Sequence, residues 1–169
     1  HPAFLVRRWV EREGEAKAIQ WMEENNQPAP LVLRPRLGRL DSHGLVERMR
    51  GEGVAAGAVT REGEEVVEVA AGSRGAFSGK AFKEGLFTVQ DPAQMAAAEI
   101  LAPQKGEVVW DACAAPGGKT TQLGEMIERV GGGQVMATDR SESRLASVVE
   151  NVHRLGLASH VTTGVHDLL

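Results

Sequence analysis

The sequence predicts an α/β fold, with a parallel sheet in the second half of the chain and a small α+β module before it. Two observations carry this prediction. Short apolar segments alternate with helix-length amphipathic segments from residue 92 to residue 165, and such alternation is typical of βαβ units. Between residues 31 and 70 the expected order is strand, helix, strand, strand. A chain of 169 residues can form one or two small domains with a buried core.

The first 30 residues are expected to be helical and then extended. A helix is predicted from residue 4 to about residue 22, and Gly14 is a candidate break within it. Pro28 and Pro30 end the helix, because the residue before a proline avoids the helical region, and an extended segment follows at residues 31–33.

The next segment is predicted to form the small α+β module. Asp41 or Ser42 can cap a helix that continues to Met49. Two strands, at residues 56–59 and 65–70, flank a turn at residues 61–63. Residues 72–80 are rich in glycine and serine and are interpreted as a linker. The predicted domains are therefore residues 1–75 and 76–169.

In the second half, helices and strands are predicted to alternate along the chain. The expected helices are residues 92–101, 118–130 and 142–155, and the expected strands are residues 107–110, 134–138 and 160–165. Helices of this length between strands imply a parallel sheet.

A glycine-rich loop at residues 111–120 joins the first of these strands to the second helix. Ligands of open α/β sheets bind where strand carboxyl ends meet helix N-termini, so the loop predicts a nucleotide-like ligand. A phosphate-binding P-loop would need glycine where Cys113 stands, and a dinucleotide fingerprint would need separated glycines instead of adjacent Gly117 and Gly118. The loop pattern alone leaves the ligand open.

The loop sequence DACAAPGGKTTQL, residues 111–123, resembles the first S-adenosylmethionine-binding motif of the RNA 5-methylcytosine methyltransferases of the NOL1/NOP2/sun class. Residues 85–92, Asp139 with Arg144, and residues 151–156 resemble further segments of that family. Residues 1–9 and 25–27 are similar to its N-terminal region. The resemblance implies a partial Rossmann-like methyltransferase sheet, preceded by a small RNA-recognition-like domain, although no aromatic-rich strand that would stack bases is present.

The resemblance implies that the loop holds the cofactor. The expected cofactor-binding residues in the loop are Cys113, Ala114, Ala115, Pro116, Gly117, Gly118 and Lys119. The two glycines would let backbone amides meet the methionine carboxylate; the alternative is a tight turn without a ligand. Lys119 opposes the helix dipole, which suggests a partner such as that carboxylate or Asp111, and Asp111 is expected to brace the loop.

Two further acids are expected at strand ends. Asp139 follows the second parallel strand, where an acid can accept both ribose hydroxyls; the alternative is capping of the next helix. Asp167 follows the third strand, and the resemblance implies a hydrogen bond with the adenine amino group; an exposed loop acid is the alternative. Arg144 is either a brace for Asp139 or an exposed helical arginine.

Catalytic residues are not expected within this chain. The resemblance implies a thiolate that attacks C6 of cytosine, and a second cysteine that helps to release the product, both from later motifs. Cys113 corresponds to the cofactor loop instead, so it is not expected to be the nucleophile. The chain begins at His1 and stops at Leu168-Leu169, in what reads as the end of a strand, so we expect an inactive piece of a longer enzyme.

Composition limits the partners. The net charge is −4. Five arginines gather early, at positions 34, 36, 39, 48 and 50; they could line a phosphate-binding face or be ordinary solvated surface. A single cysteine argues against a disulfide framework and a cysteine-based zinc site, so no metal is expected. With no apolar run of membrane-spanning length and no leader pattern, a cytoplasmic location and no membrane partner are expected.

The predicted function is that of a fragment of an RNA cytosine-C5 methyltransferase, with ribosomal RNA as the expected substrate. A non-catalytic RNA-binding module and a nicotinamide-dependent Rossmann oxidoreductase are the alternatives. We also expect the apolar strand at residues 108–110 to have an open edge, through which the isolated chain would self-associate.

Overall fold

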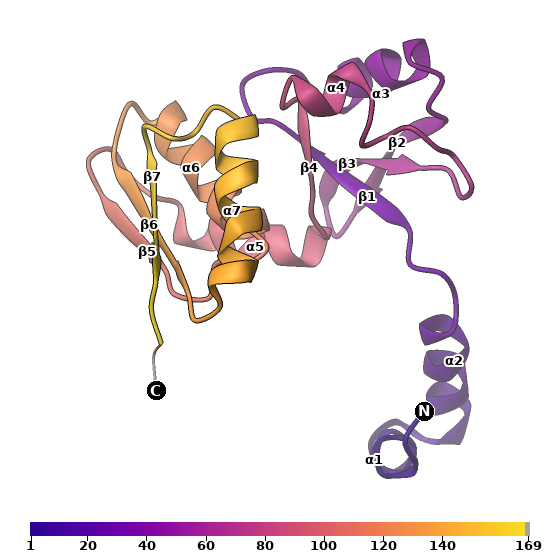
Figure 1. Ribbon diagram of the computed structural model, residues 1–169. Helices are drawn as coiled ribbons and strands as arrows, with labels where there is room; N and C mark the ends of the chain where they lie inside the picture. Colours follow the sequence, from indigo (N-terminus) through magenta and orange to yellow (C-terminus); the bar gives the residue numbers. More distant parts are fainter. Residues whose placement is uncertain (168–169) are drawn as a thin grey trace. The chain divides into compact units, whose positions relative to one another are not determined.

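The computed structural model describes residues 1–167, so that Leu168 and Leu169, and the strand end expected there, lie outside the described residues. The chain divides into two compact units, His1–Pro30 and Leu31–Leu169 (Figure 1). Each unit is described by itself.

The first unit is a helical hairpin. Helices α1 (Ala3–Glu13) and α2 (Glu15–Asn25) are separated by Gly14, whose φ of 85° lies in the left-handed region that favours glycine. The rings of Trp9 and Trp21 pack edge to face, with 5.8 Å between the ring centroids. Ala18 of α2 is fully buried. The predicted break at Gly14 is confirmed.

The second unit begins with a four-stranded antiparallel sheet (Figure 1). Its elements are β1 (Leu31–Pro35), α3 (Ser42–Gly51), β2 (Ala56–Arg61), β3 (Glu64–Val69), α4 (Lys80–Lys83) and β4 (Phe87–Val89). The strand order is β2-β3-β1-β4. This is a β-α-β-β-α-β arrangement of the ferredoxin-like kind. The predicted first four elements are confirmed, and Asp41 caps α3 by accepting a hydrogen bond from the Gly44 N–H.

Helix α4 and strand β4 were not expected from the sequence. Elements of four and three residues are too short to show a helical or strand period. Both follow residue 75, and Ala76 is buried in the core of the antiparallel sheet. The sheet therefore draws on residues from both sides of the expected boundary, and the division into residues 1–75 and 76–169 stays a prediction.

The antiparallel sheet is covered on both faces. Leu33, Val67 and Phe87 pack with α3 on one face. On the other face, Val32 and Val66 pack against Met95, which belongs to α5 (Pro92–Leu101). An RNA-recognition domain stacks bases on an open sheet face. In this chain α5 covers the middle of that face.

A three-stranded parallel sheet forms the rest of the unit. Strands β5 (Val108–Asp111), β6 (Gln134–Asp139) and β7 (Val161–Val165) lie in the order β5-β6-β7, and α6 (Gly118–Arg129) and α7 (Glu142–Arg154) pack on one face (Figure 1). The core of this sheet consists of side chains from both helices, from the strands and from the segment between α7 and β7, among them Ile127, Val135, Val148, Leu157 and Val161. The predicted α/β fold with a parallel sheet is confirmed.

Two of the five early arginines are buried, so for these two both expectations, a phosphate-binding face and ordinary solvated surface, are wrong. Arg34 and Arg36 are 2% and 3% exposed. Arg34 pairs with Glu125, and Arg36 pairs with Glu128 and donates to the Leu155 carbonyl oxygen. A buried guanidinium needs such partners, because an unpaired charge in the protein interior is costly. Strand β1 and the residue that follows it are thereby tied to α6 and to the C-cap of α7.

Two of the remaining three early arginines are exposed but engaged. Arg48 forms ion pairs with Glu52 and Glu84, and the Nε of Arg50 donates to the Ala56 carbonyl oxygen. These contacts favour the interpretation as solvated surface. Within residues 1–167, no helix has the length and apolarity that a membrane crossing requires.

Candidate functional site

The loop between β5 and α6 is anchored to both flanking strands. Asp111, the last residue of β5, accepts a hydrogen bond at 2.6 Å from the hydroxyl of Thr120, which is fully buried. The Ala114 N–H donates to the Thr138 carbonyl oxygen on β6 at 2.9 Å. The loop therefore has a defined path, and Asp111 braces it as expected.

Helix α6 starts directly at the two glycines. Gly117 has a φ of 108°, and a Cβ atom built there would lie 3.3 Å from the Val148 Cα atom of α7. Backbone conformation and space therefore both favour glycine at this position. The first N–H groups of any helix have no intrahelical acceptor and carry a partial positive charge, so the end of α6 at Gly118 is suited to an anionic ligand group.

Lys119 is exposed in the first turn of α6. Within the described residues it forms no ion pair with Asp111, which instead accepts the hydrogen bond from Thr120. The expectation of a Lys119–Asp111 pair is therefore not met. The other expected partner, a carboxylate of a ligand, stays a prediction.

Asp139 ends β6 in a nearly buried position, with 4% of its surface exposed. Its two carboxylate oxygens accept hydrogen bonds from the N–H groups of Ser141, at 3.0 Å, and Ala115, at 3.2 Å. The Ser141 N–H and then the Ala115 N–H lower the pKa of the Asp139 carboxyl, against the opposing effect of burial, and Arg144 adds to the lowering. Asp139 is thus held as a carboxylate at the carboxyl end of β6, the central strand of the sheet.

The capping alternative for Asp139 does not hold, because Ser141 is the N-cap of α7. Its hydroxyl oxygen accepts a hydrogen bond from the Arg144 N–H. The Arg144 guanidinium donates to the Ala115 carbonyl oxygen at 3.2 Å and lies 4.0 Å from the Asp139 carboxylate. Of the two interpretations of Arg144, the brace for Asp139 matches these contacts.

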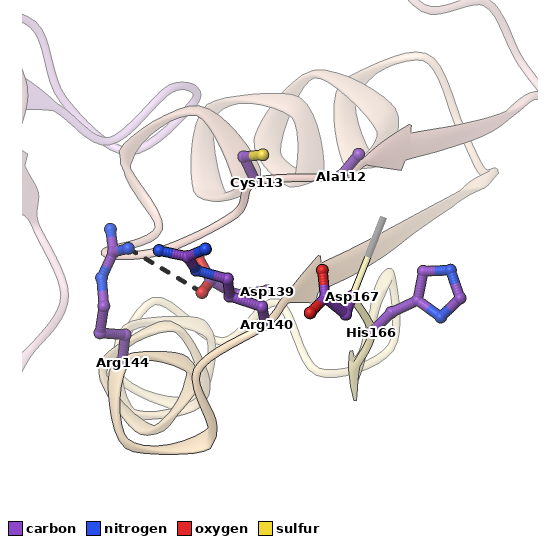
Figure 2. A pocket seen from close by; sticks show the side chains of 7 residues that line it. All are labelled: Ala112, Cys113, Asp139, Arg140, Arg144, His166 and Asp167. Atoms are coloured by element: carbon purple, nitrogen blue, oxygen red, sulfur yellow. Dashed lines mark ion pairs between the residues drawn. The ribbon is translucent and has the colours of Figure 1, made fainter. Parts of the chain in front are cut away.

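A pocket of about 310 Å³ opens at the carboxyl ends of the three parallel strands (Figure 2). It is lined by Ala112, Cys113, Asp139, Arg140, Arg144, His166 and Asp167. Three expected site residues, Cys113, Asp139 and Asp167, therefore come together from three strand ends. Figure 2 shows Cys113 and Ala112 across the pocket from the two acids.

The other expected loop residues are not among those that line the pocket. Ala114 is 4% exposed and Gly117 is buried, while Ala115 and Pro116 present backbone oxygens to α7. Gly118 and Lys119 belong to the first turn of α6. A role for these residues in binding rests on backbone groups and on the helix end, and it stays a prediction.

Three lining residues were not identified from the sequence: Ala112, Arg140 and His166. Each directly follows a strand end or precedes an expected acid, which is the signal that would have found them. The His166 N–H donates to the Asp139 carbonyl oxygen at 3.1 Å, so the segment after β7 is fixed beside β6. Figure 2 shows the His166 ring directed away from the other labelled side chains.

Metal ligands do not gather in the described part of the chain, where no three His, Cys, Asp or Glu residues are placed to hold an ion. Cys113, the single cysteine, is exposed at the rim of the pocket. It lies on the loop after β5, and its part in binding a cofactor stays a prediction.

Comparison with known families finds one family model that matches the second half of the chain. Residues 98–167 match the family model described as 16S rRNA methyltransferase RsmB/F. This match spans α6, β6 and α7 together with all seven residues that line the pocket. Over these residues, the chain is similar to the RsmB/F methyltransferase family.

Curated ribosomal RNA methyltransferases align with nearly the whole chain. The ribosomal RNA small subunit methyltransferase B of Serratia proteamaculans is 34% identical over 164 residues, which cover 97% of this chain and 37% of that protein. The protein of the same name from Erwinia tasmaniensis shows the same identity and coverage. The chain thus spans 37% of the length of these curated relatives.

Solved structures share the fold over the same extent. A methyltransferase homolog protein from Pyrococcus horikoshii is 28% identical with a TM-score of 0.78, over 97% of this chain and 52% of that one. NSun6 from Pyrococcus horikoshii, solved with SFG, superposes with a TM-score of 0.83 over 98% of this chain and 65% of that one. At 18% identity, the second likeness shows the fold alone.

Proposed function

We propose that the pocket binds S-adenosylmethionine, and that the chain is the cofactor-binding part of an RNA cytosine-C5 methyltransferase that acts on ribosomal RNA. The observation that carries the proposal is the convergence of Cys113, Asp139 and Asp167 at the carboxyl ends of three parallel strands. The match of residues 98–167 to the RsmB/F family model supports the reaction and the substrate class. A ribosomal RNA substrate agrees with the cytoplasmic location expected from the sequence.

The described residues fit such a cofactor. A pocket of about 310 Å³ lies within the range of small-molecule sites, at roughly 300–1,000 Å³. Asp139, held charged by two backbone N–H groups, would accept the ribose hydroxyls, since each carboxylate oxygen has a second lone pair. Asp167 would accept from the adenine amino group. The N-terminus of α6 and Lys119 would face the methionine carboxylate.

The bound cofactor would supply an electrophilic methyl group, and the chain's own residues would orient it. Cys113 is not assigned the attacking role, because it lies in the loop that is proposed to position the cofactor. The thiolate that makes C5 of cytosine nucleophilic would come from a part of the enzyme other than residues 1–169. The chain alone is therefore proposed to bind cofactor without methylating RNA.

The proposal is tested by calorimetric titration of S-adenosylhomocysteine into the 169-residue chain. Saturable binding that Asp139→Ala abolishes is expected. Arg129→Gln, a change at an exposed position outside the pocket, is the control that should bind normally. Saturable binding of NAD in place of S-adenosylhomocysteine would favour the oxidoreductase, and binding that Asp139→Ala leaves unchanged would contradict the site.

The proposed reaction and substrate are tested separately. Labelled S-adenosylmethionine and a 16S ribosomal RNA transcript are incubated with this chain or with the full-length parent enzyme. Label at C5 of cytosine is expected with the parent enzyme and none with the chain. Label at any other atom would contradict the proposed reaction.

A further inference from the structure

The Ala115 residue of the glycine loop is held at both of its backbone polar groups. Its N–H donates to the Asp139 carboxylate at 3.2 Å, and its carbonyl oxygen accepts from the Arg144 guanidinium at 3.2 Å. Arg144 also lies 4.0 Å from the other Asp139 oxygen, as the dashed line in Figure 2 marks. Ala115 of the glycine loop, Asp139 at the end of β6 and Arg144 of α7 thus each contact the other two.

A second side chain of α7 reaches the next carbonyl of the loop. The Asn151 side-chain amide donates to the Pro116 carbonyl oxygen at 3.4 Å. Arg144 and Asn151 are seven residues apart, so they lie two turns apart on one face of α7. Two consecutive loop carbonyls are therefore turned toward α7.

The orientation of the Pro116 carbonyl fixes the direction of the next backbone N–H group, that of Gly117. In a trans peptide the C=O and N–H groups point in opposite directions. Since the Pro116 carbonyl faces α7, the Gly117 N–H points away from α7. The contacts from α7 thus set the direction of a loop amide at the start of α6, where an anionic ligand group would bind.

We propose that Arg144 is a positioning residue for the cofactor, which holds the Ala115 peptide against Asp139 and thereby fixes the glycine loop for binding. The inference rests on the proposed function of the pocket. Arg144 acts through Ala115 and Asp139, and Asn151 supports the same loop one residue further on.

Removal of Arg144 should lower affinity more than stability. The Arg144 side chain is 60% exposed, and exposed ion pairs contribute little to folding. A loop that is no longer held must instead be ordered when the ligand binds, and that cost falls on affinity. A purely structural arginine would show the opposite pattern.

The test compares Arg144→Gln, Arg144→Lys and the control Arg129→Gln, which makes the same charge change in the last turn of α6. Titration of S-adenosylhomocysteine into the 169-residue chain and thermal unfolding are measured for each. Arg144→Gln should raise the Kd about tenfold with a melting temperature within about 2 °C of the parent chain. Arg144→Lys should recover part of the affinity, and Arg129→Gln should change neither quantity.

Each result is decisive. An unchanged Kd for Arg144→Gln, while Asp139→Ala still abolishes binding, would overturn the inference and leave the proposed function intact. A fall in melting temperature that accounts for the weaker binding, with no recovery in Arg144→Lys, would overturn it in favour of a structural role. Failure of the unmodified chain to bind would overturn the proposed cofactor site together with the inference.

Discussion

The guanidinium of Arg34, on β1, forms a two-point ion pair with the carboxylate of Glu125, in the middle of α6. The nitrogen–oxygen distances are 2.5 and 3.1 Å, and the two side chains are 2% and 0% exposed. Gln90 accepts a further hydrogen bond from the Nε of Arg34, and the Leu37 N–H donates to Glu125. The helix whose first turn follows the glycine loop is therefore anchored to the antiparallel sheet.

Replacement of Glu125 by Gln should destabilise the chain strongly, because it leaves the buried Arg34 cation without a counter-charge. A loss of about 3–5 kcal/mol in the free energy of unfolding is expected. Urea denaturation at neutral pH measures it. Arg34→Met combined with Glu125→Leu should recover much of the loss, since a buried apolar pair avoids the desolvation of two charges.

The control for this prediction is Glu68→Gln, which breaks the exposed pair between Arg61 and Glu68. A change of about 0–1 kcal/mol is expected there. Equal losses for Glu125→Gln and Glu68→Gln would show that burial of the Arg34 pair does not matter for stability.

Replacement of Gly117 by Ala should lower both stability and affinity for S-adenosylhomocysteine. The positive φ of 108° disfavours a side chain, and the added Cβ atom would lie 3.3 Å from the Val148 backbone. A loss of about 1–3 kcal/mol in unfolding free energy is expected, measured by thermal or urea denaturation.

Gly118→Ala is the matched control for Gly117→Ala. A Cβ atom at Gly118 would meet the Gln90 side chain at an ordinary contact distance of 3.6 Å, and no positive φ opposes it. Gly118→Ala should therefore cost less stability. If it were the more damaging of the two, the conformational explanation for Gly117 would be wrong.

Glu99 should make the stability of the chain depend on pH. Burial raises the pKa of the Glu99 carboxyl, and the neighbouring carboxyl of Glu64 raises it further. The folded chain therefore holds this proton more tightly than the unfolded chain. The stabilisation is present at low pH and is lost as the pH rises through the raised pKa.

Glu99→Gln removes the charge that the fold disfavours at neutral pH. The variant should be more stable than the parent chain at pH 7, by about 0.5 kcal/mol or less because the side chain is exposed. The difference should disappear at acid pH. Glu47→Gln, at an exposed acid of α3, is the control. If the stability gained by Glu99→Gln increased toward low pH, the Glu99 pKa would be shifted in the opposite direction.

Strand β5 should mediate self-association of the isolated chain. Within the described residues β5 pairs with β6 alone, and Val108 and Trp110 are 70% and 50% exposed on the face opposite α6 and α7. Exposed apolar strand edges pair with other chains. Sedimentation velocity at increasing concentration should show association, which Val108→Lys reduces.

Ile100→Lys is the control for the strand edge, because Ile100 is an exposed apolar residue on α5, outside the sheet. It should leave association unchanged. A chain that sediments as a monomer at every concentration would rule out pairing through β5.

The sequence by itself determined the strand–loop–helix order and the acids at the strand ends. These features follow from local signals. Alternating apolar and amphipathic segments predicted β5 to β7 within one residue at either end, and the adjacent Gly117 and Gly118 marked the helix start where the structure has it. Asp139 and Asp167 were expected at strand ends because each follows a predicted strand, and the carboxyl ends of parallel strands lie at one edge of a sheet.

Only the tertiary structure decided which charged residues are buried and which side chains complete the pocket. Arg34 and Glu125 are 91 residues apart in sequence, and no local pattern states that they will meet. Arg144 reaches Ala115 only once α7 has packed beside the loop. Composition and periodicity report the preferences of one segment at a time, whereas an ion pair or a loop contact depends on how distant segments pack.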